Sequence, residues 1–214
     1  LLCDLGRGDL PPEGFNEALL FLISKGGTLT ALDARPLAVT NTDNRILAKC
    51  MVAAVSDGLN TAIGPRQAGF LAGRKGDPHI TDINQNFYGS VKDGGKAYHL
   101  FFLDLYKAYD SVHWEWMEIT LKRIGLPSWA INIVRALLTD VRVSPFFGTR
   151  VNVWILVTRG VRQGCPFSPL IFLVCYEPLL CRLRKTVPKM HRWAFADDLA
   201  CGSIHLHDFS AVMR

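Results

Sequence analysis

Acidic residues placed at the ends of apolar runs constrain this chain more than any other feature. Asp104 follows the apolar run Phe101-Phe102-Leu103, and Asp197 and Asp198 lie in a tight turn between two further apolar runs. If the fold brings these carboxylates into one small volume, pairs about 4 Å apart repel by roughly 4 kcal/mol at an effective dielectric near 20. Such a cluster persists when hard divalent cations neutralise it. Because a pair of metal ions is the apparatus of in-line phosphoryl transfer, the pattern predicts a protein that handles nucleotides.

The positive charge is concentrated in one part of the chain. The overall net charge is only +5, but residues 141–193 contain nine Arg and Lys residues and a single acid, Glu177. A local charge of this size and sign suits a polyanionic partner such as a nucleic acid. A basic face that serves solubility alone would have the same composition.

The remaining composition is that of a folded globular protein. Hydrophobic residues make up 49% of the chain and charged residues 20%, an ordinary globular balance, so a disordered chain is not expected. No apolar stretch approaches the roughly 20 residues of a membrane span, and the N-terminus lacks the order of a signal peptide. The six cysteines form no CxxC pair, which indicates reduced core residues of an intracellular protein. Nothing in the sequence distinguishes the nucleus from the cytoplasm.

Helix and strand patterns are mixed along the chain without strict alternation. Apolar spacing predicts helices at 43–59, 81–91, 114–124, 129–138 and 169–184, with Asp43, Asp110-Ser111 and Ser128 as the N-caps of the first, third and fourth. Strands are predicted at 35–40, 97–103, 193–196 and 199–202, with a hairpin formed by 141–147 and 151–158 around Gly148. This mixture favours an α+β fold over a doubly wound sheet.

Five blocks of the sequence resemble the reverse transcriptase domain of non-LTR (LINE-type) retrotransposons and the related group II intron enzymes. The blocks are Arg35-Pro36-Leu37, Gln67-Ala68-Gly69-Phe70, the segment around Asp104, Arg159-Gly160-Val161-Arg162-Gln163-Gly164-Cys165-Pro166, and Phe195-Ala196-Asp197-Asp198. Each block alone is a weak signal, whereas five in the family's order and spacing are a strong one. The resemblance runs over about residues 15–202.

This resemblance implies the α+β fold of a right-hand polymerase. Residues 1–96 would form the fingers and residues 97–214 the palm, whose antiparallel sheet is backed by helices. The helical thumb of such enzymes is absent, so we expect one C-terminally truncated reverse transcriptase domain. The chain alone is then expected to have weak activity or none.

The resemblance also implies RNA-directed DNA polymerase activity. Such an enzyme transfers a nucleotide from a dNTP to the 3′-hydroxyl of a DNA primer on an RNA template, with two Mg²⁺ ions that Mn²⁺ can replace. By position, Asp104, Asp197 and the backbone carbonyl of Leu105 correspond to metal ligands. Asp198 completes the catalytic carboxylates and serves the primer end less directly.

Further residues are assigned by their place in the motifs. Tyr109 would lie under the incoming sugar, where its ring excludes a 2′-hydroxyl and so favours deoxynucleotides. Substrate contacts are expected from Lys25 and Arg35 at the triphosphate, and from Gln163 and Gly164 at the nascent base pair. Template and primer contacts are expected from Gln67, Phe70, Arg74, Arg159 and Arg162.

Two other interpretations account for part of the pattern. An RNA-dependent RNA polymerase shares the palm chemistry but usually has Gly-Asp-Asp and a second Asp near the sugar, which Ala196 and Tyr109 do not match. A catalytically inactive retroelement remnant, kept as an RNA-binding module, would fit the short chain. The intact Asp104, Asp197 and Asp198 argue against such decay.

Overall fold

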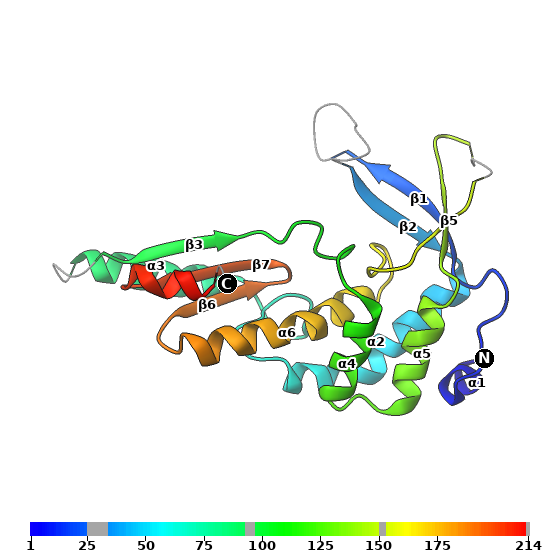
Figure 1. Cartoon of the computed structure of the whole chain (residues 1–214), viewed down its shortest axis with the longest axis horizontal. Coiled ribbons are helices and arrows are strands. Elements are labelled where there is room, and N and C mark those ends of the chain that lie inside the picture. The colour runs from blue at the N-terminus through cyan, green and yellow to red at the C-terminus, as the bar shows by residue number, and fades with distance from the viewer. Residues whose placement is uncertain (25–33, 93–96, 150–152, 213–214) are drawn as a thin grey trace. The chain divides into compact units, whose positions relative to one another are not determined.

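The computed structural model describes residues 1–24, 34–92, 97–149 and 153–212 (Figure 1). The chain divides into two compact units, each built from two separate segments. The first unit comprises Leu1–Val55 and Tyr109–Cys175, and the second comprises Ser56–Ala108 and Tyr176–Arg214. The predicted division into fingers at 1–96 and palm at 97–214 stays a prediction. Lys25 lies outside the described residues.

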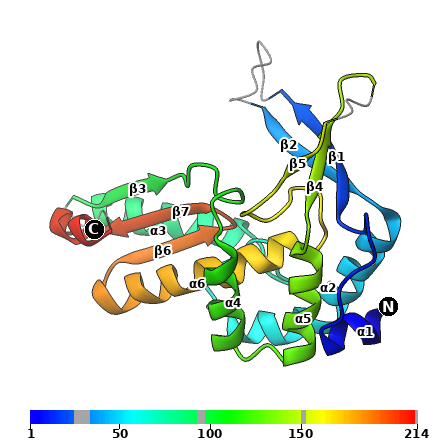
Figure 2. The same cartoon turned by 45° about the vertical axis from the view of Figure 1, so that its right-hand side comes forward.

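The first unit contains a four-stranded sheet. Its strands, in spatial order, are β2 (Arg35–Thr40), β1 (Glu17–Ile23), β4 (Arg142–Pro145) and β5 (Ile155–Leu156). Strand β1 pairs antiparallel with β2 and parallel with β4, while β4 and β5 pair antiparallel (Figure 2). The pairing of β4 with β5 confirms the hairpin that was predicted around Gly148.

The helices confirm the apolar spacing of the sequence but correct three predicted caps. The helices of the first unit are α1 (Leu2–Arg7), α4 (Trp114–Arg123) and α5 (Ser128–Leu138). The N-caps of α4 and α5 are His113 and Pro127, and Asp43 lies inside α2. Asp110-Ser111 does not cap α4, because the helix begins at Trp114, three residues after Ser111. The turn before it is held to a distant loop, since the carbonyls of Tyr109 and Val112 accept bonds from the 160–161 backbone.

Two long helices contribute residues to both units. Helix α2 spans Thr42–Ala62 and helix α6 spans Ser168–Thr186. The apolar face expected for α2 is buried at Leu47, Met51, Val55 and Leu59. Ile46, expected on the same face, is exposed. No helix in the described ranges is long and apolar enough to cross a membrane.

The second unit contains the antiparallel sheet that carries the acidic motifs. Its strand order is β3 (His99–Leu103), β7 (Asp198–Ser203) and β6 (His191–Phe195), and both pairings are antiparallel (Figure 1). The unit also contains α3 (Asp77–Lys92) and the 3₁₀ helix η1 (Leu206–Ala211). These elements confirm the α+β class that was predicted from the sequence.

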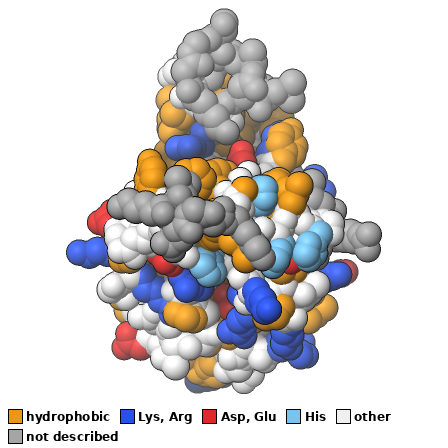
Figure 3. All heavy atoms as spheres, turned by 90° about the vertical axis from the view of Figure 1, so that its left-hand side faces the viewer, with side chains coloured by type: hydrophobic (Ala, Val, Ile, Leu, Met, Phe, Trp, Pro, Cys, Tyr) orange, Lys and Arg blue, Asp and Glu red, His pale blue; other side chains and the backbone are white. Residues whose placement is uncertain are grey.

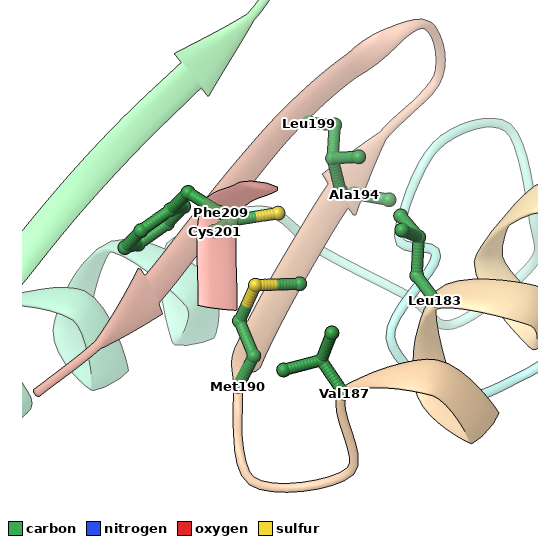
Figure 4. Packing of buried hydrophobic residues seen from close by; sticks show 7 residues of the cluster. All are labelled: Leu183, Val187, Met190, Ala194, Leu199, Cys201 and Phe209. Carbon is green, nitrogen blue, oxygen red and sulfur yellow. The ribbon is translucent and has the colours of Figure 1, made fainter. Parts of the chain in front are cut away.

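A compact apolar cluster fixes one face of this sheet. Its members come from α6 and the segment after it, β6, β7 and η1 (Figure 4): Leu183, Val187, Met190, Ala194, Leu199, Cys201 and Phe209. Successive side chains of a strand point to opposite faces, so the inward Leu199 and Cys201 leave Asp198 and Ala200 on the other face. The core thereby determines which way the acidic end of β7 points.

Candidate functional site

Strand pairing brings two of the three predicted catalytic carboxylates to the same edge of the second unit's sheet. Leu103, the last residue of β3, pairs with Leu199 of β7. Asp104 directly follows Leu103 and Asp198 directly precedes Leu199, so the two acids occupy neighbouring strand ends. Both are exposed, and both line a cavity of about 650 Å³.

Asp197 belongs to the hairpin turn that joins β6 to β7. Phe195 pairs with Asp198, which leaves Ala196 and Asp197 as the two turn residues. Ala196 is buried and has a φ of 56°. A positive φ at the first central residue is a feature of the tight turns that join twisted antiparallel strands. The hairpin predicted from the sequence is confirmed, and it places Asp197 at the tip.

The three carboxylates interact electrostatically. Partial burial raises the pKa of Asp198, and the negative charges of Asp197 and Asp104 raise it further. Mutual repulsion of this kind is expected of carboxylates that lie close together. An oxygen-only donor set of this charge fits a hard divalent cation. Within the described part of the chain, no group of three or more His, Cys, Asp or Glu side chains is arranged to hold a metal ion.

The cavity beside Asp104 and Asp198 has a largely apolar wall. The sheet contributes the aromatic side chains of Phe102, Trp193 and Phe195, and the start of α3 contributes His79 and Ile80. Phe102 is 74% exposed. Burial lowers the pKa of His79, whose buried Nε2 atom has no hydrogen-bond partner among the residues that the structure describes. The cavity therefore combines an acidic end with exposed aromatic surface.

Of the template contacts expected around Gln67, two have side chains that are engaged inside the protein. Gln67 is 1% exposed and is hydrogen-bonded to the backbone of Ala196. Arg74 donates to carbonyl groups at and after the end of α2, which are those of Asn60, Ile63, Gly64 and Gln67. These contacts satisfy carbonyls that a helix end leaves without partners. Phe70, by contrast, is 53% exposed and has a φ of 57°.

The first unit contains the residues predicted to contact the incoming nucleotide. The ring of Tyr109 stacks on Phe172, with ring centroids 5.0 Å apart and planes inclined by 11°. Arg35 is exposed at the start of β2. The carbonyl of Gln163 accepts a hydrogen bond from the amide of Ala38, with a donor–acceptor distance of 2.8 Å.

Gly164 lies very close to the backbone of β2. Its φ is 108°, and a Cβ atom at this position would lie 2.6 Å from the carbonyl oxygen of Ala38 in β2. The glycine is therefore required by packing against β2. Its contact with the nascent base pair stays a prediction.

Arg159 and Arg162, both predicted to contact phosphates, differ in burial. Arg159 is exposed, whereas Arg162 is 8% exposed. The Arg162 guanidinium donates to the backbone oxygens of Asn16 and Leu137 and to the side-chain oxygens of Asn16 and Asn44. Because these acceptors are neutral, burial dominates and lowers the pKa of Arg162. The structure thus assigns Arg162 to the interior of the first unit, which the sequence reasoning missed.

We expect Arg162→Met to lower the free energy of unfolding by about 3 kcal/mol, since several buried oxygens would lose a charged donor. The matched change Arg159→Met, at an exposed position, should alter it by less than about 0.5 kcal/mol. Urea denaturation of both variants measures the difference. Unchanged stability of Arg162→Met together with weaker RNA binding would instead support the phosphate contact.

Comparison with known proteins supports the motif assignment. The family described as reverse transcriptase (RNA-dependent DNA polymerase) matches residues 23–214. A retrovirus-related Pol polyprotein of the type-1 retrotransposable element R2 from Popillia japonica is 32% identical over 210 residues, covering 90% of this chain and 28% of the polyprotein. The transposon TX1 149 kDa protein of Xenopus laevis is 26% identical over 179 residues, covering 84% of this chain and 14% of that protein. The chain thus spans less than a third of the length of either relative.

Solved structures of low sequence identity share the fold. Telomerase from Candida tropicalis in complex with a fragment of telomeric RNA superposes with a TM-score of 0.66 at 10% identity, covering 99% of this chain and 40% of the telomerase. The apo form truncated from its C-terminal domain gives a TM-score of 0.63 at 11% identity, covering 99% of this chain and 49% of that one. At such identities the likeness shows the fold alone, and it agrees with the α+β class described above.

Proposed function

The chain belongs to the reverse transcriptase (RNA-dependent DNA polymerase) family, and from this premise we propose that it forms the catalytic core of an RNA-directed DNA polymerase of a non-LTR retrotransposable element. The observation that carries the proposal is the meeting of Asp104 and Asp198 at neighbouring strand ends, with Asp197 in the adjoining turn. The reaction is transfer of a nucleotide from a dNTP to a primer 3′-hydroxyl.

In this proposal Asp104, Asp197 and the backbone carbonyl of Leu105 hold two Mg²⁺ ions, which Mn²⁺ can replace. When bound, such metal ions lower the pKa of the primer hydroxyl and stabilise the leaving pyrophosphate. Asp198 helps to orient the primer end. The repulsion that raises the pKa of Asp198 supports this assignment, because a cation would relieve it.

Each unit presents exposed residues that suit contacts with a nucleic acid. Phe70 and Arg159 are exposed and suit contacts with the template and primer. Exposed basic residues of the second unit lie at the end of α6 and just after it, at Arg182, Arg184, Lys185 and Lys189. Figure 3 shows Lys and Arg side chains gathered on part of one face. This charge suits a polyanionic partner.

The first test is primer extension on poly(rA)/oligo(dT) with dTTP and Mg²⁺, using this chain and a version extended past Arg214. Extension that requires the divalent cation would support the proposal, and poly(dA)/oligo(dT) measures the preference for an RNA template. Binding of the RNA–DNA duplex without extension by either version would overturn it in favour of an RNA-binding module.

Tyr109→Val is expected to lower the preference for dNTPs over rNTPs by roughly 10- to 100-fold, because the ring that excludes a 2′-hydroxyl is removed. The stacking of Tyr109 on Phe172 supports this role, since a ring held in place excludes the hydroxyl more strictly. Single-nucleotide incorporation with dTTP and UTP measures the ratio. Tyr106→Val, at a tyrosine that is 81% exposed, is the matched control and should leave the ratio unchanged.

A further inference from the structure

The segment before α3 runs along the hairpin that carries the acidic pair. Gln67 forms a parallel bridge with Ala194 of β6. The amide of Ala68 donates to the carbonyl of Ala194 over 2.8 Å, and the amide of Ala194 donates to the carbonyl of Arg66 over 2.9 Å. Residues 66–68 therefore extend the sheet beyond β6, next to the turn.

The side chain of Gln67 continues this pairing into the turn itself. Its Nε2 donates to the carbonyl of Ala196 over 3.0 Å, and its Oε1 accepts from the amide of Ala196 over 2.8 Å. The same oxygen accepts from the amide of Gly69 over 2.9 Å. A carboxamide carries a donor and an acceptor side by side, so it satisfies both backbone groups of one residue.

The turn needs this support for two reasons. Ala196 has a φ of 56°, a conformation that costs a residue with a Cβ atom about 1 kcal/mol. Ala196 is also buried, and a buried backbone group without a partner costs a further 1–3 kcal/mol or so. The fit is tight on the other side as well, because a Cβ atom at Gly69 would lie 2.4 Å from the amide nitrogen of Ala196.

The acidic residues around the turn add a force that acts against this geometry. Asp104 follows the end of β3 and the other two acids are on the hairpin, so repulsion between them would be relieved if the tip of the hairpin swung away from β3. A two-residue turn without further contacts offers little resistance to such a movement. The bonds from Gln67 hold Ala196, the residue directly before Asp197, and so oppose it.

We infer that Gln67 is a positioning residue, which fixes the backbone of Ala196 and thereby holds Asp197 and Asp198 beside Asp104. The inference rests on the proposed function for the role of the carboxylates. It assigns the Gln67-Ala68-Gly69 block to support of the catalytic turn. The template contact expected of Gln67 requires an exposed side chain, which this residue does not have.

The test compares Gln67→Met, which keeps the length of the side chain but removes its donor and acceptor, with Leu59→Ala. Leu59 lies in α2 within the same unit and is 3% exposed, outside the apolar cluster that contains Ala194 and Leu199, so its truncation destabilises the unit away from the turn. Amide hydrogen exchange of the segment 194–199 is measured in both variants under conditions in which both are folded. We expect exchange about tenfold faster in Gln67→Met and unchanged in Leu59→Ala.

Primer extension by the same proteins gives the catalytic readout. Gln67→Met should lower kcat by about 10- to 100-fold with little change in the KM for dTTP, whereas Leu59→Ala should retain the wild-type kcat. If Gln67 contributed to stability alone, the apparent kcat of both variants would fall in proportion to their unfolded fractions. Unchanged exchange in Gln67→Met, or faster exchange with wild-type kcat, would overturn the inference.

The inference and the proposed function can fail separately. If neither this chain nor the version extended past Arg214 extends a primer, the proposed function fails. The inference is then tested by whether Mg²⁺ slows hydrogen exchange in 194–199. Slowing in the wild type that is lost in Gln67→Met would support it. Equal slowing in both proteins, or slowing in neither, would overturn it.

Discussion

Asp104→Asn is expected to abolish primer extension, with a loss on the order of 10³-fold, while the protein remains folded. The substitution preserves the size of the side chain but removes one of the carboxylates that would hold the metal ions and balance their charge. Asp104 is exposed at the end of β3, so no buried interaction is lost. Steady-state extension with saturating dTTP and Mg²⁺ measures the effect.

Asp77→Asn is the matched control for this prediction. Asp77 lines the same cavity as Asp104 but belongs to the first turn of α3, and it does not contribute to the raised pKa of Asp198. We expect Asp77→Asn to retain activity within about twofold of the wild type, as for an ordinary surface substitution. Equal losses in the two variants would contradict a specific role for Asp104.

Asp104→Asn should also change how the free energy of unfolding depends on pH. The raised pKa of Asp198 means that the folded protein binds this proton more tightly than the unfolded chain. Without divalent metal, the free energy of unfolding contributed by this group therefore falls as the pH rises through its titration range. Asp104→Asn removes one cause of the shift and should weaken that fall. Thermal unfolding in EDTA at several pH values, repeated with Mg²⁺, would show it.

Most of the predicted fold followed from local sequence patterns. The strand that delivers Asp104 and the hairpin around Asp197-Asp198 follow from short apolar runs and turn chemistry, which depend on neighbours in sequence. The register in which β3 pairs with β7 does not follow from local patterns. That Leu103 pairs with Leu199 depends on residues 96 positions apart, and only the family resemblance pointed to their meeting. The caps were predicted wrongly where the turn before α4 bonded to a distant loop.

The roles of polar residues inside the motifs were the hardest to predict. Gln67 and Arg162 belong to blocks that resemble a nucleic-acid enzyme, so a ligand contact was the natural expectation. Their hydrogen-bond partners lie 129 and 146 residues away along the chain, at Ala196 and Asn16. A sequence shows that a side chain is polar, but not whether its partner is a ligand or a distant backbone group. Burial, which is a property of the whole fold, makes that distinction.

Gly164→Ala is expected to lower the free energy of unfolding by about 3 kcal/mol. A residue with a Cβ atom at a φ of 108° is strained, and that strain alone costs on the order of 1–2 kcal/mol. The new Cβ atom would also lie 2.6 Å from the carbonyl oxygen of Ala38, a backbone atom that cannot turn aside as a flexible side chain does. Relief of this clash would weaken the bond from the Ala38 amide to Gln163, at a further cost of about 1 kcal/mol.

Gly125→Ala is the matched control that separates the cost of backbone strain from the cost of the steric clash. Gly125 has a φ of 86°, but a Cβ atom there would meet no atom within 4 Å, so we expect a loss of only about 1 kcal/mol. Urea denaturation of the two variants isolates the effect of packing against β2. Because Gly164 fixes its loop to the strand that begins with Arg35, Gly164→Ala should also raise the KM for dTTP at temperatures where it is folded. Equal stabilities and KM values in the two variants would show that the contact with Ala38 constrains neither the fold nor the nucleotide site.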